Sequence, residues 1–295
     1  MAGSRYAYVR NFELADPLLP STFFVIRLDG KGFHGFSKAH NFAKPNDVKA
    51  LELMNEAAKR VMGGRELNGE CVLGFGESDE YSFVFKRSCK LHGRRASKLI
   101  TLVTSVFTSA YVALWPRYFP NSSLDLEHLP VFDGRVVQYV TETEIRDYVR
   151  WRQVDTHINN LYNTCFWALV LQGGRSEFEA NKELSGTISS QKQEMLFSQF
   201  GINYNTLDPM FRKGSIVLWE AEEEPEEATK DGEEEGEKAE EPTPRPPGVP
   251  DGVKLRQRKA SAKPRPKKRK LVVVHEDLIA DSWWEEGRGK GLLDG

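Results

Sequence analysis

The hydrophobic positions in the first half of the chain predict an alternation of strands and helices. STFFVIRLDG is apolar and ends in a turn signal, which is typical of a buried strand. NDVKALELMNEAAKRVMGG predicts a helix, because Val48, Leu51, Met54, Ala58 and Val61 recur near helical spacing between a capping residue and two glycines. ECVLGFG and EYSFVFK predict two strands joined by the turn GESDE, RRASKLITLVTSVFTSAYVALW predicts a long helix, and VFDGRVVQYV predicts another strand.

The order of these elements is β-α-β-β-α-β. In the ferredoxin-like arrangement this order places both helices on one face of an antiparallel sheet, with the first and third strands as central neighbours. We therefore expect an α+β fold with a ferredoxin-like core. Capping boxes at 141–144 and 176–179, followed by SSQKQEMLFSQFG, predict additional helices, and FRKGSIVLWE predicts a further strand. These mainly helical elements form a second lobe or surround the sheet.

Charge is segregated along the chain, although the net charge is only −2. Residues 220–241 are strongly acidic, and a Pro-rich stretch then leads to the basic run KLRQRKASAKPRPKKRK. Both blocks are too charged and too poor in apolar residues to fold alone. We expect a body over residues 1–219 with a helical second lobe, a disordered low-complexity insert over 220–270, and a segment over 271–295 that packs back on the body. The basic run 263–270 fits a nuclear-import signal, an RNA-contacting tail or a solvated linker.

Composition narrows the class of protein. A hydrophobic content of 39% supplies a globular core. No apolar run approaches the roughly 18 residues of a membrane span, and the N-terminus lacks the apolar core of a signal peptide. Cys71, Cys89 and Cys165 are too sparse for a disulfide framework and have no C-x-x-C spacing. We expect an intracellular protein, cytoplasmic or nuclear or both, that does not act on membranes.

The stretch RLDGKGFHGFS contains the pattern G-x-G-x-x-G at Gly30, Gly32 and Gly35. A dinucleotide-binding turn requires these glycines to open a helix inside a β-α-β unit, with an acidic residue at the end of the second strand. The next helix is expected ten or more residues later, behind Pro45, and the candidate acid Glu52 falls inside that helix. The P-loop pattern is absent as well, so we reject the dinucleotide-binding fold.

Two aspartates give the glycines another role. Asp29 ends the first expected strand, and Asp79 lies in the turn before the third, its neighbour in the sheet. Carboxylates that converge repel each other unless divalent metal neutralises them. Two Mg²⁺ ions about 4 Å apart would suit in-line phosphoryl or nucleotidyl transfer, and the glycines would let backbone N–H groups approach a triphosphate. Lys31, His34 and Lys44 add charge or donors nearby, although both aspartates also fit ordinary turn chemistry.

Several longer motifs occur in a fixed order: RLDGKGFHGFS, HNFAKPND, GESDEYSFVFKR, RRASKL, FDGRVV and WRQVDTHINNLYNTCFWAL. Together with GINYN and PMFRKGS they resemble the tRNA-histidine guanylyltransferase family, over almost the whole body and again at HEDLIADSWW. The resemblance implies a core like the palm of template-directed polymerases, with two Mg²⁺ ions, ATP and GTP as substrates, tRNA-His as partner and a homotetramer. It implies that ATP activates the tRNA 5′-phosphate, that the GTP 3′-hydroxyl attacks it, and that pyrophosphate is finally removed from the new 5′ end.

The resemblance also implies roles for single residues. The catalytic residues are Asp29, Asp79 and Glu80, and the metal ligands are Asp29, the Gly30 carbonyl and Asp79. The nucleotide-binding residues are Asp29, Gly30, Lys31, Gly32, Phe33, His34, Lys44, Ser78 and Asp79, with Lys44 at the triphosphate of the activating nucleotide. The candidates for the second triphosphate or the tRNA are Arg27, Arg95, Lys98, Arg135, His157 and Asn160.

Other interpretations stay open. Arg95 and Lys98 also fit a solvated helix start, and His157 fits an interior histidine. The aromatic residues Trp151, Tyr162, Phe166 and Trp167 are expected in the core rather than as base-stacking platforms. A template-dependent 3′-to-5′ tRNA repair polymerase or a nucleotide cyclase would use the same palm. A non-catalytic RNA-binding scaffold would need neither the aspartates nor the glycines.

Overall fold

The computed structural model describes residues 4–222 and 269–294. The sequence predicts a disordered insert over residues 220–270. Of these, residues 223–268 lie outside the described ranges. The strands are β1 (Phe23–Gly30), β2 (Cys71–Glu77), β3 (Glu80–Phe85), β4 (Phe132–Tyr139), β5 (Ser215–Ala221) and β6 (Arg269–Val274). The helices are α1 (Phe33–Ala39), α2 (Val48–Gly63), α3 (Ala96–Tyr118), α4 (Glu142–Leu171), α5 (Glu177–Leu184), α6 (Ser189–Phe200), α7 (Pro209–Lys213) and α8 (Asp281–Glu285). The 3₁₀ helices are η1 (Ala7–Phe12), η2 (Leu91–Arg94), η3 (Leu126–His128) and η4 (Tyr204–Thr206).

The strands of the described residues form one sheet in the order β4-β1-β3-β2-β5-β6. β1 lies between β3 and β4 and is antiparallel to both, so the first and third strands are neighbours as their order predicts. In this register Asp29 lies opposite Glu80 of β3 and Asp133 of β4. The α+β prediction is therefore confirmed as a mixture of helices and an antiparallel sheet.

The start of α1 corrects one premise of the sequence analysis. A helix does follow the glycines directly, because α1 begins at Phe33, next to Gly32. Gly32 has a φ of 70°, a left-handed conformation that glycine adopts without steric cost. The dinucleotide-binding fold is still excluded, because both neighbours of β1 are antiparallel and no parallel β-α-β unit surrounds the turn.

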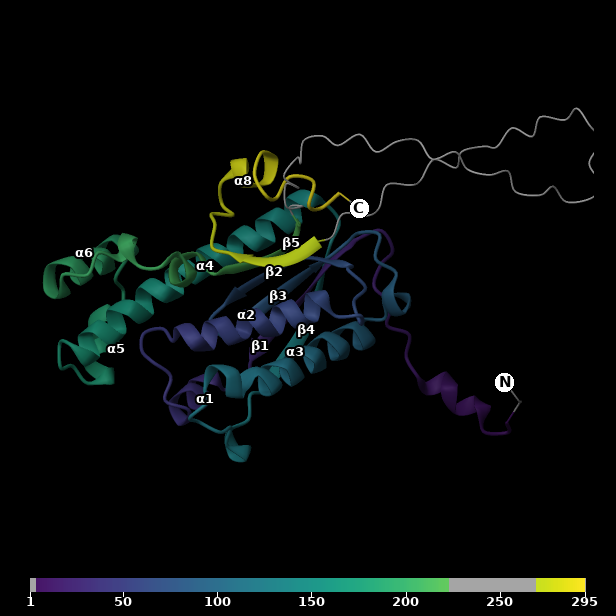
Figure 1. Cartoon of the computed structure of the whole chain (residues 1–295), viewed down its shortest axis with the longest axis horizontal. Helices are drawn as coiled ribbons and strands as arrows, with labels where there is room; N and C mark the ends of the chain where they lie inside the picture. The colour runs from purple at the N-terminus through teal and green to yellow at the C-terminus, as the bar shows by residue number, and fades with distance from the viewer. Residues whose placement is uncertain (1–3, 223–268, 295) are drawn as a thin grey trace, which may run out of the picture. The chain divides into compact units, whose positions relative to one another are not determined.

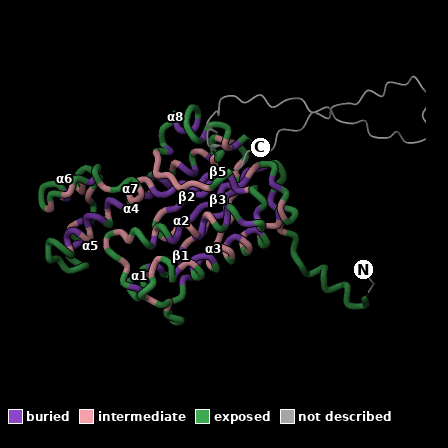
Figure 2. The backbone as a smooth tube through the Cα atoms, viewed as in Figure 1, coloured by how far each residue is buried: buried purple, intermediate pink, exposed green. Residues whose placement is uncertain are grey.

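One face of the sheet packs against α2 and α3. Alternate side chains of β1 point to this face, where Phe24, Ile26 and Leu28 are fully buried in one hydrophobic core. Figure 1 shows α2 and α3 side by side across the strands, and Figure 2 shows their inward sides buried. Packing against these helices holds β1 in place, and with it Asp29 at the end of the strand.

α3 corrects a second expectation. Among the described residues it is long and apolar enough, by length and composition alone, to cross a membrane. Its Leu99, Val103 and Phe107 side chains are buried against the sheet in the same core as β1. Its apolar face is therefore used for packing within the fold.

α4 connects the other face of the sheet to the helical lobe. Its first half packs Ile145 and Val149 against β1, and its second half packs with α5, α6 and Tyr204 in a separate core. The predicted capping box is present, with the Thr141 hydroxyl accepting a hydrogen bond from the Glu144 N–H at 3.2 Å. The middle of α4 consequently lies beside the end of the sheet that carries the two aspartates, because Asp155 and Asn159 line one cavity with Asp29 and Asp79.

The segment after β6 is bound to α4 through a buried amide. The Gln153 Nε2 donates hydrogen bonds to the carbonyl oxygens of Lys213 and Glu276, both at 2.9 Å. Its Oε1 accepts from the Leu278 N–H at 2.7 Å. Trp284 is 1% exposed and completes the core between this segment and α4. These contacts hold the first half of α4 in place on the sheet.

Candidate active site

Asp29 and Asp79 meet at one end of the sheet. The Gly30 N–H donates a 3.0 Å hydrogen bond to the Asp79 carbonyl oxygen, which ties the end of β1 to the turn between β2 and β3. Ser78 in that turn has a φ of 47°, a left-handed conformation that reverses the chain within two residues. The two aspartate side chains line the same cavity, of about 310 Å³.

Gly30 is required by this close approach. A Cβ on Gly30 would lie 2.3 Å from the ring of Phe33 and 2.8 Å from the Cβ of Asp79. Its φ is not in the left-handed region, so the absence of a side chain, and not backbone freedom, is what the position needs. The end of β1, the start of α1 and the Asp79 turn can meet only around a glycine.

The cavity carries an excess of acidic groups. Five carboxylates line it: Asp29, Glu77, Asp79, Glu80 and Asp155. Burial raises the pKa of the Asp79 carboxyl, and the charge of Asp29 raises it further. Burial likewise raises the pKa of Glu77, to about 7. Ionised carboxylates in this cavity are therefore unfavourable unless a cation neutralises them.

Two arginines neutralise part of this charge. The Arg152 Nη1 donates to both carboxylate oxygens of Glu80, at 3.0 and 2.9 Å, and its Nη2 donates to Asp155 at 2.6 Å. The Arg27 Nε lies 3.6 Å from Glu80. Glu80 is thus held by two guanidinium groups, and Asp155 by one. Among the described residues Asp29, Glu77 and Asp79 have no arginine ion pair. Burial favours the neutral form of Glu77, which hydrogen-bonds Thr156, so Asp29 and Asp79 are the carboxylates open to a cation.

The remaining donor set suits a hard divalent cation. Asp29, Asp79 and the Gly30 carbonyl offer only oxygen atoms, the ligands that Mg²⁺ prefers. No group of three His, Cys, Asp or Glu side chains among residues 4–222 and 269–294 is arranged to hold a metal by itself. A cation bound between the aspartates would complete its coordination with water or phosphate oxygens, as Mg²⁺ usually does.

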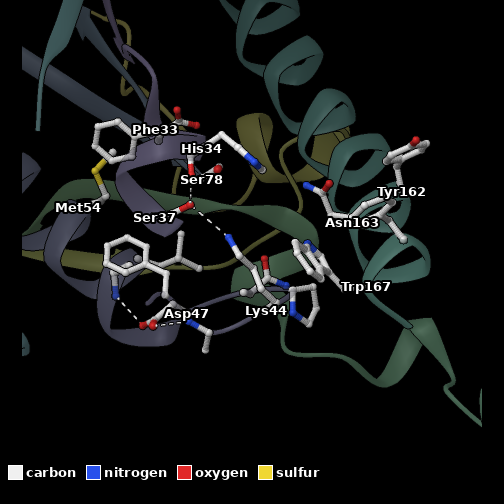
Figure 3. A pocket seen from close by; sticks show the side chains of 18 of the residues that line it. Phe33, His34, Ser37, Lys44, Asp47, Met54, Ser78, Tyr162, Asn163 and Trp167 are labelled. Carbon is white, nitrogen blue, oxygen red and sulfur yellow. Dashed lines mark hydrogen bonds between the residues drawn. The ribbon is translucent and has the colours of Figure 1, made fainter. Parts of the chain in front are cut away.

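A second cavity, of about 470 Å³, adjoins the first between α1, α2 and α4. The residues common to both are Ser78, Asp79, Tyr162 and Asn163. Lys44 is its cationic group: the ammonium donates to the Ser37 hydroxyl at 3.2 Å and lies 5.5 Å from the centre of the Trp167 ring (Figure 3). Burial lowers the pKa of Lys44. The aromatic residues Tyr162, Phe166 and Trp167, then Lys44, then the acidic cavity follow one another. This order suits a nucleotide whose base contacts the aromatic residues, whose phosphates contact the lysine, and whose metal ion lies between the carboxylates.

The structure brings some of the predicted residues together at these cavities. The ones that line either cavity are Asp29, Phe33, His34, Lys44, Ser78, Asp79 and Glu80. The Gly30 N–H donates a hydrogen bond to the Asp79 carbonyl oxygen, and Arg27 forms an ion pair with the cavity residue Glu80. Lys31 and Gly32 are exposed in the turn before α1 and line neither cavity.

The basic candidates lie elsewhere. Arg95 stands at the N-cap position of α3 without a capping side-chain hydrogen bond, and it is paired with Glu13 at 2.7 Å and Asp16 at 3.2 Å, with Lys98 exposed one turn later. This region lies next to Phe24, over whose ring the Arg94 guanidinium sits at 5.0 Å. Phe24 is five residues, about 17 Å of extended strand, from Asp29.

Arg135 is also outside both cavities. It lies on β4 opposite Arg27 and is paired with Asp133 at 3.2 Å, with both side chains about half exposed. Within a single chain, therefore, the predicted basic residues Arg95, Lys98 and Arg135 do not converge on the two aspartates.

The predicted α4 residues His157 and Asn160 lie on a face of the helix that does not line the site. His157 packs against Tyr204 with ring centres 5.3 Å apart, and burial lowers its pKa. The buried Asn160 accepts from Asn46 at 3.0 Å and donates to the Tyr204 hydroxyl at 3.1 Å. Neither lines either of the two cavities described above.

Sequence reasoning missed the α4 residues that do line the acidic cavity: Asp155, Asn159, Tyr162 and Asn163. Asn159, Tyr162 and Asn163 lie four, seven and eight residues after Asp155, which is the spacing of a single helix face. Trp151 lies one turn before Asp155, and the expectation that it is a core residue is wrong, because it is 53% exposed.

Comparison with known proteins gives consistent matches. The family model described as tRNAHis guanylyltransferase matches residues 6–140, and the one described as Thg1 C terminal domain matches residues 143–280. The chain is 54% identical over 222 residues to the tRNA(His) guanylyltransferase of Candida glabrata, covering 75% of this chain and 93% of that relative. It is similar to the crystal structure of the Saccharomyces cerevisiae enzyme, with a TM-score of 0.69 and 53% identity over 72% of this chain and 93% of the other. A bacterial Thg1-like protein in complex with ATP shares the fold, with a TM-score of 0.58 and 22% identity over 72% of this chain and 84% of that one.

Proposed function

This chain belongs to the tRNA(His) guanylyltransferase family and is a nucleotidyltransferase, and we propose that its Asp29–Asp79 pair performs that transfer with two bound Mg²⁺ ions. The observation that carries the proposal is the partly buried Asp79 carboxyl beside Asp29, in a cavity lined by five carboxylates of which only Glu80 and Asp155 are paired with arginine. Bound Mg²⁺ would supply charge stabilisation to the attacking and leaving oxygens of an in-line displacement.

We propose further that the sheet is a ferredoxin-like, polymerase-palm-like core. The order β4-β1-β3-β2, with α2 and α3 on one face, supports this assignment. On such a core the end of the central strand carries one metal ligand and the adjacent turn carries the other. Asp29 and Asp79 occupy these two positions.

The reaction proposed here has three displacements at phosphorus. A 5′-phosphate oxygen of tRNA-His attacks the α-phosphorus of ATP and pyrophosphate leaves. The 3′-hydroxyl oxygen of GTP then attacks the activated 5′-phosphorus, losing its proton, and AMP leaves. Water finally removes pyrophosphate from the new 5′ end. The chain's own residues position these groups. Lys44 contacts the ATP triphosphate, and Ser78 and His34 line the cavity in which the ATP lies. Glu80, paired with two arginines, keeps the start of β3 in place beside Asp29.

The wider assignments follow from the family. ATP and GTP are the proposed nucleotides, and a bacterial relative of the same fold is in complex with ATP. We also propose a homotetramer that works inside the cell, in the cytoplasm, the nucleus or both, with the basic run 263–270 as the sequence feature that suits the nucleus.

The proposal is tested by supplying the RNA in two chemical states. With 5′-monophosphorylated tRNA-His, ATP, GTP and Mg²⁺, the purified chain should add labelled guanosine to the 5′ end, and EDTA should abolish addition. Lys44→Ala should slow this reaction about 100-fold, because about 2.7 kcal/mol of binding to the activating triphosphate is lost. A 5′-triphosphorylated tRNA already carries a pyrophosphate leaving group, so with it Lys44→Ala should approach wild-type rates.

The same assay separates the alternatives. Equal slowing of Lys44→Ala on both RNAs would contradict its assignment to activation. Turnover of a nucleoside triphosphate without RNA would indicate a cyclase, and preference for 5′-truncated tRNAs would indicate a repair polymerase. RNA binding with no release of pyrophosphate would indicate a non-catalytic scaffold.

A further inference from the structure

Trp151 is an exposed aromatic side chain at the edge of the active site. Its side chain is 53% exposed, whereas tryptophan in a helix that packs on a sheet is ordinarily mostly buried. It lies on α4 four residues, about one turn, before Asp155, and side chains four apart on a helix lie on the same face. Asp155 and Asn159, the next two positions of this row, line the acidic cavity.

A buried cation covers one face of the indole ring. The Arg152 guanidinium carbon lies 3.9 Å from the centre of the Trp151 ring, although the Arg152 side chain is only 5% exposed. The same guanidinium donates two hydrogen bonds to Glu80, which lies opposite Asp29 in the sheet. Tyr148 contacts the ring edgewise, with centres 6.1 Å apart. Arg152 and Tyr148 therefore hold the indole ring in place. Through Arg152 and Glu80 the ring is connected to β3, next to Asp29 of β1.

An aromatic ring with a cation behind it and solvent in front is a typical surface for stacking a nucleobase. Base stacking on aromatic side chains is independent of sequence, and arginine adds to it. The position also matters, because the tRNA must bring its 5′-phosphate to the cavity that begins one helical turn away. Whatever binds Trp151 lies beside that phosphate.

We propose that Trp151 is a stacking platform for a nucleobase at the open end of the tRNA acceptor stem. This inference rests on the proposed function, since it needs the RNA 5′ end at Asp29 and Asp79. The base comes from the terminal pair or from the single-stranded 3′ end, both of which offer the same aromatic face. The neighbouring Val154 and Ile158, 40% and 51% exposed, extend the apolar surface along α4.

The test compares Trp151→Ala and Trp151→Phe with wild type in guanosine addition to 5′-monophosphorylated tRNA-His. Trp151→Ala should raise KM for the RNA roughly tenfold, from the usual loss of one base stack, with kcat and the KM values for ATP and GTP within about twofold. Trp151→Phe should keep most of the affinity. Tyr8→Ala is the matched control, because Tyr8 is 61% exposed and lines neither cavity, and it should behave as wild type.

Removing the single-stranded 3′ nucleotides from the RNA identifies the base. If the difference between wild type and Trp151→Ala disappears, the base belongs to the 3′ end; if it persists, it belongs to the terminal pair, and both results support stacking. An unchanged KM in Trp151→Ala overturns the inference. A smaller species of Trp151→Ala in size-exclusion chromatography also overturns it, by showing that the surface binds a second copy of the chain. Absence of addition by wild type would instead contradict the proposed function.

Discussion

Asp79→Asn should reduce guanosine addition at least about 1,000-fold, while the protein stays folded. The amide keeps the shape of the side chain but cannot neutralise a divalent cation, and about 4 kcal/mol of lost transition-state stabilisation corresponds to this factor. Single-turnover addition to tRNA-His at saturating Mg²⁺ and nucleotides measures the loss. Asp29→Asn should behave in the same way.

The folded state should tolerate this change. Burial and the charge of Asp29 raise the pKa of Asp79, which means that the fold disfavours its ionised form. Without divalent cation, the thermal midpoint of Asp79→Asn should therefore equal or exceed that of wild type. Asp133→Asn is the matched control: it lies opposite Asp29 on β4 but is exposed and paired with Arg135, so it should keep near wild-type activity. Near wild-type activity in Asp79→Asn would end the assignment of this residue.

Gly30→Ala should damage both stability and activity. The new methyl group would meet the Phe33 ring at 2.3 Å and the Asp79 Cβ at 2.8 Å, and both belong to packed surroundings that cannot simply retreat. Overpacking of this kind costs about 1–3 kcal/mol of unfolding free energy. Displacing Asp79 by even 1 Å should lower addition about 100-fold. Thermal unfolding and single-turnover addition measure the two effects.

Gly35→Ala is the matched control within the same glycine pattern. A Cβ on Gly35 meets nothing within 4 Å, and its φ is not in the left-handed region. Gly35 lies inside α1, lines neither cavity, and its N–H donates to the Gly32 carbonyl at 3.0 Å, so it does not take the triphosphate-binding role that the sequence suggested. Alanine there should raise the unfolding free energy by about 0.5–1 kcal/mol and leave activity unchanged. Equal behaviour of the two variants would show that close approach at Gly30 is not what the site requires.

The sequence was sufficient to predict that Asp29 and Asp79 meet. The order of strands and helices made the first and third strands neighbours, and both aspartates stood at the relevant strand ends. The short helix α1 was not predictable in the same way, because seven residues give almost no periodicity. Its Phe33 and Phe36 side chains hold it by packing against Tyr111 and Trp115, contacts that exist only in the folded chain.

The sequence was also insufficient to predict which face of α4 lines the acidic cavity. A helix of this composition offers several polar faces, and which one meets the cavity depends on where the helix docks. Gln153 and the C-terminal segment fix that docking through contacts between residues more than 100 positions apart. His157 and Asn160 therefore turned toward Tyr204, and Asp155 and Asn159 toward the aspartates.

The place where a divalent cation binds decides whether Asp29 and Asp79 are the metal ligands. A crystal of the chain with GTP and Mn²⁺, which accepts the oxygen ligands of Mg²⁺ and can be located by anomalous scattering, would test it. The account predicts manganese within about 2 Å of carboxylate oxygens from both Asp29 and Asp79, with triphosphate oxygens completing the coordination. Manganese bound away from these residues, or the two carboxylates pointing into separate cavities, would contradict it.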